Sequence, residues 1–134
     1  MIGYLLDTTI AIAIMQAHER VAKIAGEHIA AGAAAISTCS VGELYCGVHT
    51  STKPEDERRA VEELLATLEI IDYEEVAARE FGRLRAVMQR QGLIVPTMDT
   101  QIAAIAIVNG LTVVSFDRHF TLIPDLPVEN WLEP

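Results

Sequence analysis

The stretch Gly3-Tyr4-Leu5-Leu6-Asp7-Thr8-Thr9, close to the start of the chain, contains the pattern on which the fold is built. Gly3–Leu6 is a short apolar run that ends at an acid, which is typical of a buried β-strand. The residues from Thr8 to about Met15 then carry Ile10 and Ile14 four positions apart, a spacing that predicts a helix. A buried strand that passes directly into a helix is the repeating unit of α/β proteins.

The same alternation of apolar runs and helical patterns continues along the chain. It predicts an α/β fold with a mostly parallel central β-sheet, flanked by helices on both faces. The expected strands are Gly3–Leu6, Ala34–Ser37, Glu69–Asp72, Thr112–Ser115 and an edge strand at Pro127–Glu129. The expected helices are Thr8–Met15, Glu19–Ala31, one that starts at Ser40, Glu57–Thr67, Glu74–Arg90, Thr97–Val108 and a turn at Asp117–Phe120, with a polar loop at Thr50–Glu57.

The composition fits one folded domain over residues 1–134. Hydrophobic residues make up 51% of the chain and charged residues 22%, which is too apolar for a disordered protein. The polar loop marks no domain boundary, because neither side is large enough to bury a core alone. Cys39 and Cys46 lack the partners that a zinc site needs, so we expect reduced thiols.

We expect a soluble, cytoplasmic protein that does not associate with a membrane. The first residues lack the positive charge and the small-residue cleavage site of a signal peptide. The longest apolar runs, such as Ile10–Met15 and Ile102–Val108, are far shorter than the roughly 20 residues that cross a bilayer.

The net charge of −9, from 19 acidic and 10 basic residues, bears on the class of partner. Nucleic-acid-binding proteins are usually basic, so this charge argues against such a partner. A metal site nevertheless needs local acid, and a bound divalent cation reverses the local potential. The overall charge therefore leaves a metal-dependent role open.

Four acidic residues are expected at one edge of the sheet. Asp7 follows the first strand, and Asp117 lies two residues beyond the fourth. Glu43 and Asp99 lie in the first turns of two predicted helices. Ligands of open α/β sheets bind at the carboxyl ends of the strands, so these acids mark the candidate site.

Carboxylates that converge in a partly dry cleft repel one another, and a divalent cation relieves this repulsion. Mg²⁺ accepts one or two carboxylates together with waters and substrate phosphates, and Mn²⁺ accepts similar ligands. The chemistry that this set favours is metal-assisted phosphodiester hydrolysis, in which one ion activates a water and a second, if present, stabilises the leaving oxygen.

Each acid also has a purely structural interpretation, which the sequence leaves open. Asp7 could cap the helix that follows it. Ser40-Val41-Gly42-Glu43 matches a capping box, so Glu43 could serve its own helix. Asp99 could be a first-turn acid favoured by the helix dipole, and Asp117 a turn residue. Their placement at one edge is what favours a shared metal site.

The segments around these acids resemble the motifs of PIN domains, in particular those of the VapC-type toxins. Tyr4-Leu5-Leu6-Asp7-Thr8-Thr9 resembles the opening motif, in which Asp-Thr-Asn follows the first strand. Three later segments resemble the second, third and fourth motifs, and a last one the usual tail. They are, in that order, residues 40–47 (SVGELYCG), 99–104 (DTQIAA), 113–120 (VVSFDRHF) and 124–131 (PDLPVENW). Order and spacing agree across nearly the whole chain.

The resemblance implies a single PIN domain that acts as a metal-dependent endoribonuclease. Asp7, Glu43, Asp99 and Asp117 would be the acidic quartet that holds Mg²⁺ or Mn²⁺, with Asp7 and Asp99 as the first-ranked ligands. It also implies three partners: an RNA substrate, a cognate VapB-type antitoxin that silences the toxin, and a second copy of the chain in a homodimer. An antitoxin arginine that enters the acidic cleft would pair well with these carboxylates.

Four further residues have roles that depend on the resemblance. Thr9 stands where the family usually has Asn, and its hydroxyl could still orient Asp7 or a water on the metal. Ser115 could act in a similar way near Asp117. Arg118 and His119 could reach an RNA phosphate, although solvated surface charge is their ordinary interpretation.

Two alternatives to the nuclease remain. One is a non-catalytic PIN-like module that binds RNA or protein. The other is a Mg²⁺-dependent phosphatase of the haloacid dehalogenase type. That family needs a second Asp two residues after the first, where this chain has Thr9, and a later Lys, whereas no Lys follows Thr97.

Overall fold

A five-stranded sheet in the order β3-β2-β1-β4-β5 organises the computed structural model, which describes residues 1–132. Every neighbouring pair of strands is parallel, and β5 lies at an edge. The predicted mostly parallel sheet is therefore confirmed. The strands are β1 (Tyr4–Leu6), β2 (Ala34–Ser37), β3 (Glu69–Ile71), β4 (Thr112–Val114) and β5 (Val128–Glu129).

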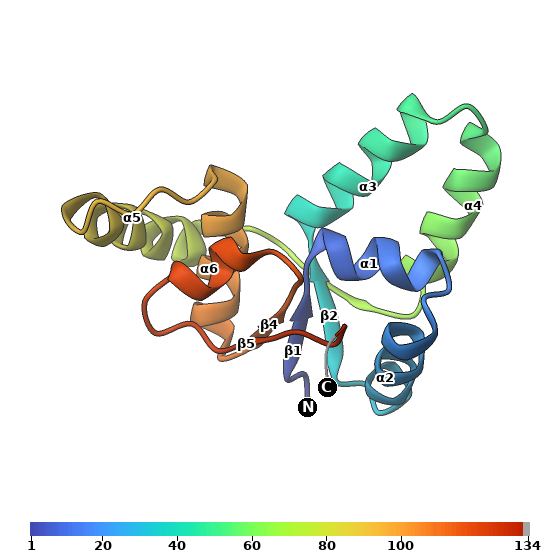
Figure 1. Cartoon of the computed structure of the whole chain (residues 1–134), viewed down its shortest axis with the longest axis horizontal. Helices are drawn as coiled ribbons and strands as arrows, with labels where there is room; N and C mark the ends of the chain where they lie inside the picture. The colour runs from blue at the N-terminus through green and yellow to red at the C-terminus, as the bar shows by residue number, and fades with distance from the viewer. Residues whose placement is uncertain (133–134) are drawn as a thin grey trace.

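Helices cover both faces of the sheet, as predicted. Figure 1 shows α5 and α6 on one side and α1 to α4 on the other. The helices are α1 (Thr8–Met15), α2 (Glu19–Ala30), α3 (Thr38–Thr50), α4 (Pro54–Leu65), α5 (Glu75–Arg90), α6 (Thr97–Asn109) and the short 3₁₀ helix η1 (Arg118–Leu122). No helix within residues 1–132 is long and apolar enough to cross a membrane.

Alternate residues of the central strands feed two separate cores, because successive side chains of a strand point to opposite faces. Leu5 and Val113 belong to the core shared with α5 and α6, where Leu84 and Ile105 are also fully buried. The neighbouring residues in each strand pack against α1 to α4 instead. That second core includes Leu6, Ile10, Val21, Ile36, Val48, Val61 and Val114.

The helix expected at Glu57–Thr67 starts earlier than predicted, so the expected loop at Thr50–Glu57 is wrong in extent. Helix α3 continues to Thr50 and α4 begins at Pro54. Proline suits the first helical position, because its fixed φ is helical and it has no N–H to leave unpaired. The three acids that follow it lie in the first turn, where the helix dipole favours negative charge.

Helix α3 also begins earlier than predicted, at Thr38 rather than Ser40. Its N-cap is Ser37, the last residue of β2, whose hydroxyl accepts a hydrogen bond from the backbone N–H of Ser40 at 3.2 Å. Ser40 is itself buried inside the first turn. The predicted capping box from Ser40 to Glu43 is therefore wrong, and Glu43 lies one turn further along the helix.

The direction of the chain connections reverses between β1 and β4. From β1 the chain continues to β2 on one side, whereas from β4 it continues to β5 on the other. This reversal is the topological switch point at which open α/β sheets bind ligands. Asp7 directly follows β1 and Asp117 closely follows β4, so the topology places both at this switch point.

Candidate active site

Asp7 is a buried carboxylate at the junction of β1 and α1, with only 4% of its surface exposed. Its Oδ1 accepts hydrogen bonds from the hydroxyl of Thr9 at 2.6 Å and from the N–H of Ile10 at 3.1 Å. Its Oδ2 accepts one from the hydroxyl of Ser115 at 2.5 Å. Asp7 is thus also the N-cap of α1, as its structural interpretation expected.

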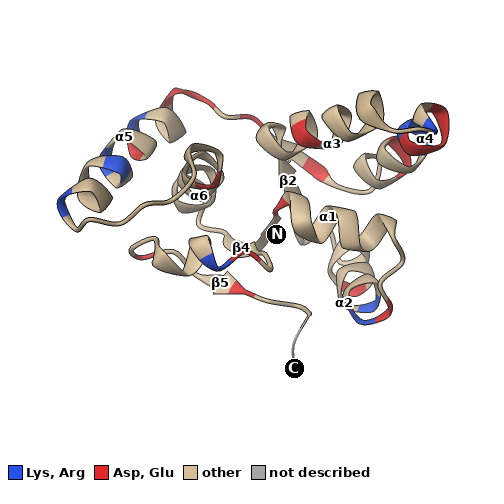
Figure 2. Ribbon diagram, turned by 45° about the horizontal axis from the view of Figure 1, so that its top comes forward, with Lys and Arg blue, Asp and Glu red and all other residues tan. Residues whose placement is uncertain are grey.

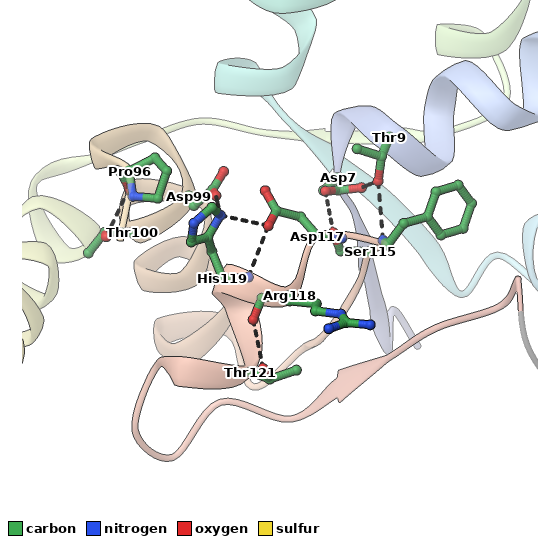
Figure 3. A network of polar contacts seen from close by, with 11 residues as sticks. Asp7, Thr9, Pro96, Asp99, Thr100, Ser115, Asp117, Arg118, His119 and Thr121 are labelled. Atoms are coloured by element: carbon green, nitrogen blue, oxygen red, sulfur yellow. Dashed lines mark hydrogen bonds and ion pairs between the residues drawn. The ribbon is translucent and has the colours of Figure 1, made fainter. Parts of the chain in front are cut away.

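The two hydroxyls tie Asp7 to the chain that leaves β4. Thr9 Oγ1 accepts a hydrogen bond from the N–H of Phe116 at 3.3 Å, and Ser115 Oγ accepts one from the N–H of Asp117 at 2.8 Å. Figure 3 shows this network around Asp7. Burial raises the pKa of Asp7 above its usual value, although the hydrogen bonds from Ser115, Thr9 and Ile10 act to lower it.

A second group consists of Asp99, in the first turn of α6, and Asp117 and His119, at the start of η1. The His119 Nδ1 atom lies 2.7 Å from Asp117 Oδ1 and 3.8 Å from Asp99 Oδ2. One ligand atom from each residue lies within 4.8 Å of the others. In Figure 3 the carboxylate of Asp117 lies between those of Asp7 and Asp99.

The pKa values of the two carboxylates of this group are shifted in opposite directions. Burial, followed by the proximity of Asp117, raises the pKa of Asp99 to about 7. Burial also acts on Asp117, but the N–H of His119, the proximity of Asp99 and the His119 side chain outweigh it, and the pKa of Asp117 is lowered. Just below pH 7, Asp99 therefore retains a proton that Asp117 has released.

This group fits a small divalent cation. Asp99 Oδ2 is buried and has no hydrogen-bond partner among residues 1–132. An unpaired buried carboxylate oxygen is unfavourable, and a cation would supply the missing partner. Oxygen-rich sets of this kind suit Mg²⁺ and Mn²⁺. Figure 2 shows acidic positions on α3, on α6 and at the start of α1, on the elements that border the carboxyl end of the sheet.

Glu43 is the member of the predicted quartet that stands apart. It is exposed on α3, and its Oε1 accepts a hydrogen bond from the hydroxyl of Thr8 at 2.5 Å. Because Thr8 follows Asp7 directly, this bond places Glu43 at the rim of the site. The carboxylates that the structure brings into electrostatic contact are those of Asp7, Asp99 and Asp117.

The two residues predicted to reach an RNA phosphate point in different directions. The side chain of Arg118 extends away from Asp99, toward the region below Ser115 in Figure 3. His119 turns inward to the carboxylates of Asp99 and Asp117. Sequence reasoning did not foresee this contact of His119, although a histidine two residues after a candidate ligand was the available signal. Nor did it foresee the bond from Thr8 to Glu43.

Comparison with known proteins gives a consistent result. A family model described as "PIN domain" matches residues 4–126. "Ribonuclease VapC2" from Haemophilus influenzae is 35% identical over 134 residues, which cover 98% of this chain and 100% of that protein. A "tRNA(fMet)-specific endonuclease VapC" from Salmonella typhimurium is 37% identical over 97 residues, which cover 72% of this chain and 74% of that one.

A solved structure extends the similarity to three dimensions. The crystal structure of DNA-bound VapBC from Salmonella typhimurium matches with a TM-score of 0.91 at 32% identity, covering 98% of this chain and 99% of that one. The alternation of strands and helices, the parallel sheet and the acidic cluster therefore occur in a chain that resembles these proteins over almost its entire length.

Proposed function

The chain belongs to the PIN-domain family and, within it, to the VapC ribonucleases, and from this premise we propose that it is a metal-dependent endoribonuclease. Its reaction is the hydrolysis of RNA phosphodiester bonds. The observation that carries the proposal is the convergence of Asp7, Asp99 and Asp117 at the switch point of the sheet, with a buried carboxylate oxygen of Asp99 left unpaired. Buried polar atoms without a partner are uncommon in folded proteins, and a carboxylate oxygen left in this way beside two other carboxylates favours a bound cation.

Asp7, Asp99 and Asp117 would hold Mg²⁺ or Mn²⁺, with Glu43 reaching the site from its rim. When bound, the ion supplies Lewis-acid activation of a water and charge stabilisation at the phosphate. Thr9 and Ser115 hold the Asp7 carboxylate in one orientation through their short hydrogen bonds. Positioning residues of this kind set both the affinity and the geometry of a metal site.

The acidic cluster also supports a regulatory partner. The Salmonella structure is a DNA-bound VapBC complex, and a solved structure from Mycobacterium tuberculosis is described as a member of the VapBC family of toxin–antitoxin systems. We propose that a VapB-type antitoxin also binds the present chain. An arginine of that antitoxin would pair with the carboxylates in place of the metal and the RNA. A homodimer and a cytoplasmic location belong to the same proposal.

An RNA-cleavage assay tests the function. Purified protein is incubated with total RNA in Mg²⁺, in Mn²⁺ or in excess chelator, beside the Asp7→Asn variant. We expect discrete cleavage products only with a divalent ion and wild-type protein. Intact RNA under every condition, together with equal toxicity of the wild type and Asp7→Asn on expression, would leave the non-catalytic binding module as the better interpretation.

A further inference from the structure

The position of His119 bears on which metal ion the site selects. His119 lies in the first turn of η1. Its Nδ1 points toward the carboxylates of Asp99, in the first turn of α6, and Asp117, the N-cap of η1. About half of its side chain is exposed, so it is not held there by burial in the core. The contacts that orient its ring toward the site are those with Asp99 and Asp117.

These atoms lie close enough together for one ion to contact all three residues, since one ligand atom of each lies within 4.8 Å of the others. Metal–oxygen and metal–nitrogen bonds of about 2.1 Å place adjacent octahedral ligands about 3.0 Å apart and opposite ones about 4.2 Å apart. The observed distances from His119 Nδ1 are 2.7 Å to Asp117 Oδ1 and 3.8 Å to Asp99 Oδ2. The latter oxygen is buried and lacks a hydrogen-bond partner within the described part of the chain.

We propose that His119 is a nitrogen ligand of the bound ion and makes this site select Mn²⁺, or a similar transition-metal ion, over Mg²⁺. The proposal rests on the proposed function in one respect, namely that the acidic cluster binds a divalent cation. Imidazole nitrogen suits transition metals, whereas Mg²⁺ strongly prefers oxygen ligands and retains its waters. A nitrogen beside two carboxylates therefore shifts the preference of an otherwise oxygen-only site.

A competing role for His119 is to position Asp117 by hydrogen bonding without touching the metal. The His119→Asn variant separates the two roles. An asparagine side chain has a polar nitrogen near the place of Nδ1, so it can still donate to Asp117. Its amide ligates metals only through oxygen, so it cannot supply the nitrogen ligand that favours a transition metal. His119→Ala removes both roles, and His49→Ala, at an exposed histidine in the last turn of α3, is the matched control.

The test measures metal binding directly, without RNA. Titration calorimetry gives the Mn²⁺ and Mg²⁺ affinities of the wild type and the three variants, and electron spin echo modulation of bound Mn²⁺ detects a coordinated ¹⁴N nucleus. We expect the ¹⁴N signal in the wild type and His49→Ala only. We expect His119→Ala and His119→Asn to lose about 10–100-fold in Mn²⁺ affinity, with little change for Mg²⁺.

The outcomes distinguish this inference from the proposed function. If the wild type binds Mn²⁺ with no ¹⁴N coupling, or if His119→Asn retains the wild-type preference for Mn²⁺, His119 is not a ligand and the inference is wrong, while the acidic metal site stands. If the wild type binds neither ion and Asp99→Asn behaves identically, the metal site itself fails, and the proposed function fails with it.

Discussion

At the scale of single residues, the site depends on hydroxyl groups as much as on acids. Thr9 and Ser115 both donate to Asp7, and both also accept from the backbone that leaves β4. This arrangement fixes the Asp7 carboxylate relative to Asp117 without a charged partner. The sequence indicated which residues stand next to the acids, but it could not give the direction of their side chains.

Replacement of Thr9 by valine tests whether its hydroxyl holds the Asp7 carboxylate in place. Valine keeps the shape but removes the donor to Asp7 and the acceptor for the N–H of Phe116. We expect metal affinity and RNA cleavage to fall about 10–100-fold. Thr9→Asn introduces the residue that PIN domains usually carry there and should retain most of the activity. Wild-type metal affinity and cleavage in Thr9→Val would contradict a role for this hydroxyl in holding Asp7.

The raised pKa of Asp99 predicts how stability depends on pH in the metal-free protein. Between the ordinary value of 3.8 and about 7, the folded chain holds a proton on Asp99 that the unfolded chain has released. The free energy of unfolding therefore contains a contribution that falls as the pH rises through this window. Asp7, whose pKa burial also raises, contributes in the same direction.

Urea unfolding of chelator-treated protein at pH 5 and pH 7.5 measures this effect. Asparagine resembles the protonated form of Asp99 and does not titrate, so Asp99→Asn should lose stability less steeply than the wild type as the pH rises. It should also be at least as stable as the wild type at pH 7.5. Parallel pH profiles for the two proteins would contradict the raised pKa.

At the scale of elements, the sequence located every strand and helix. The starts of helices α3 and α4 were predicted too late, and several other ends differ by one or two residues. Helix α4 began three residues early because Pro54 and the acids after it are an N-terminal signal, although their polarity resembles a loop. Helix α3 began two residues early because β2 passes into it through Ser37 with no loop between them. Ser37 and Ser40 were equally good caps by residue type, and only the backbone geometry decides between them.

Substitutions at two glycines test the backbone conformation at the end of α6 and inside its neighbour α5. Gly110 ends α6 in the left-handed conformation, with φ of 67°, whereas Gly82 lies within α5 in ordinary helical geometry. A methyl group added at either would meet no atom within 4 Å, so only the backbone conformation differs. We expect Gly110→Ala to lower the free energy of unfolding by about 1–2 kcal/mol. We expect Gly82→Ala to raise it by about 0.5–1 kcal/mol. Effects of the same sign in urea unfolding would contradict this interpretation.

At the scale of the whole molecule, the site exists only when both halves of the fold are in place. Asp7 follows the strand at the centre of the sheet, Asp99 belongs to α6 on one face, and Glu43 belongs to α3 on the other. The alternation of elements predicted a parallel sheet, and the rule for such sheets placed the acids at one edge. It could not predict the strand order, because that depends on which strands pair and not on local pattern. The separation of Glu43 from the other acids follows from the placement of α3 and was likewise not visible in the sequence.

The net charge of −9 argues against a nucleic-acid partner, but a net charge does not show where the charged side chains lie. Many basic side chains are already paired with acids on their own helices, as in the pairs Arg58–Glu55, Arg79–Glu75 and Arg83–Glu80. The acids near the carboxyl end of the sheet are instead grouped with one another. A bound divalent ion would change the sign of the potential exactly where a phosphate must approach.

Cleavage of a labelled RNA by Asp99→Asn and the wild type, at matched protein and Mn²⁺ concentrations, tests the central claim most directly. The substitution removes one carboxylate oxygen from the ion while leaving the fold intact, which circular dichroism can verify. We predict a loss of about 100-fold or more in the cleavage rate, as expected when a metal ligand worth several kcal/mol is removed. Folded Asp99→Asn that cleaves at the wild-type rate, or wild-type cleavage that continues in excess chelator, would contradict a metal-dependent ribonuclease at this site.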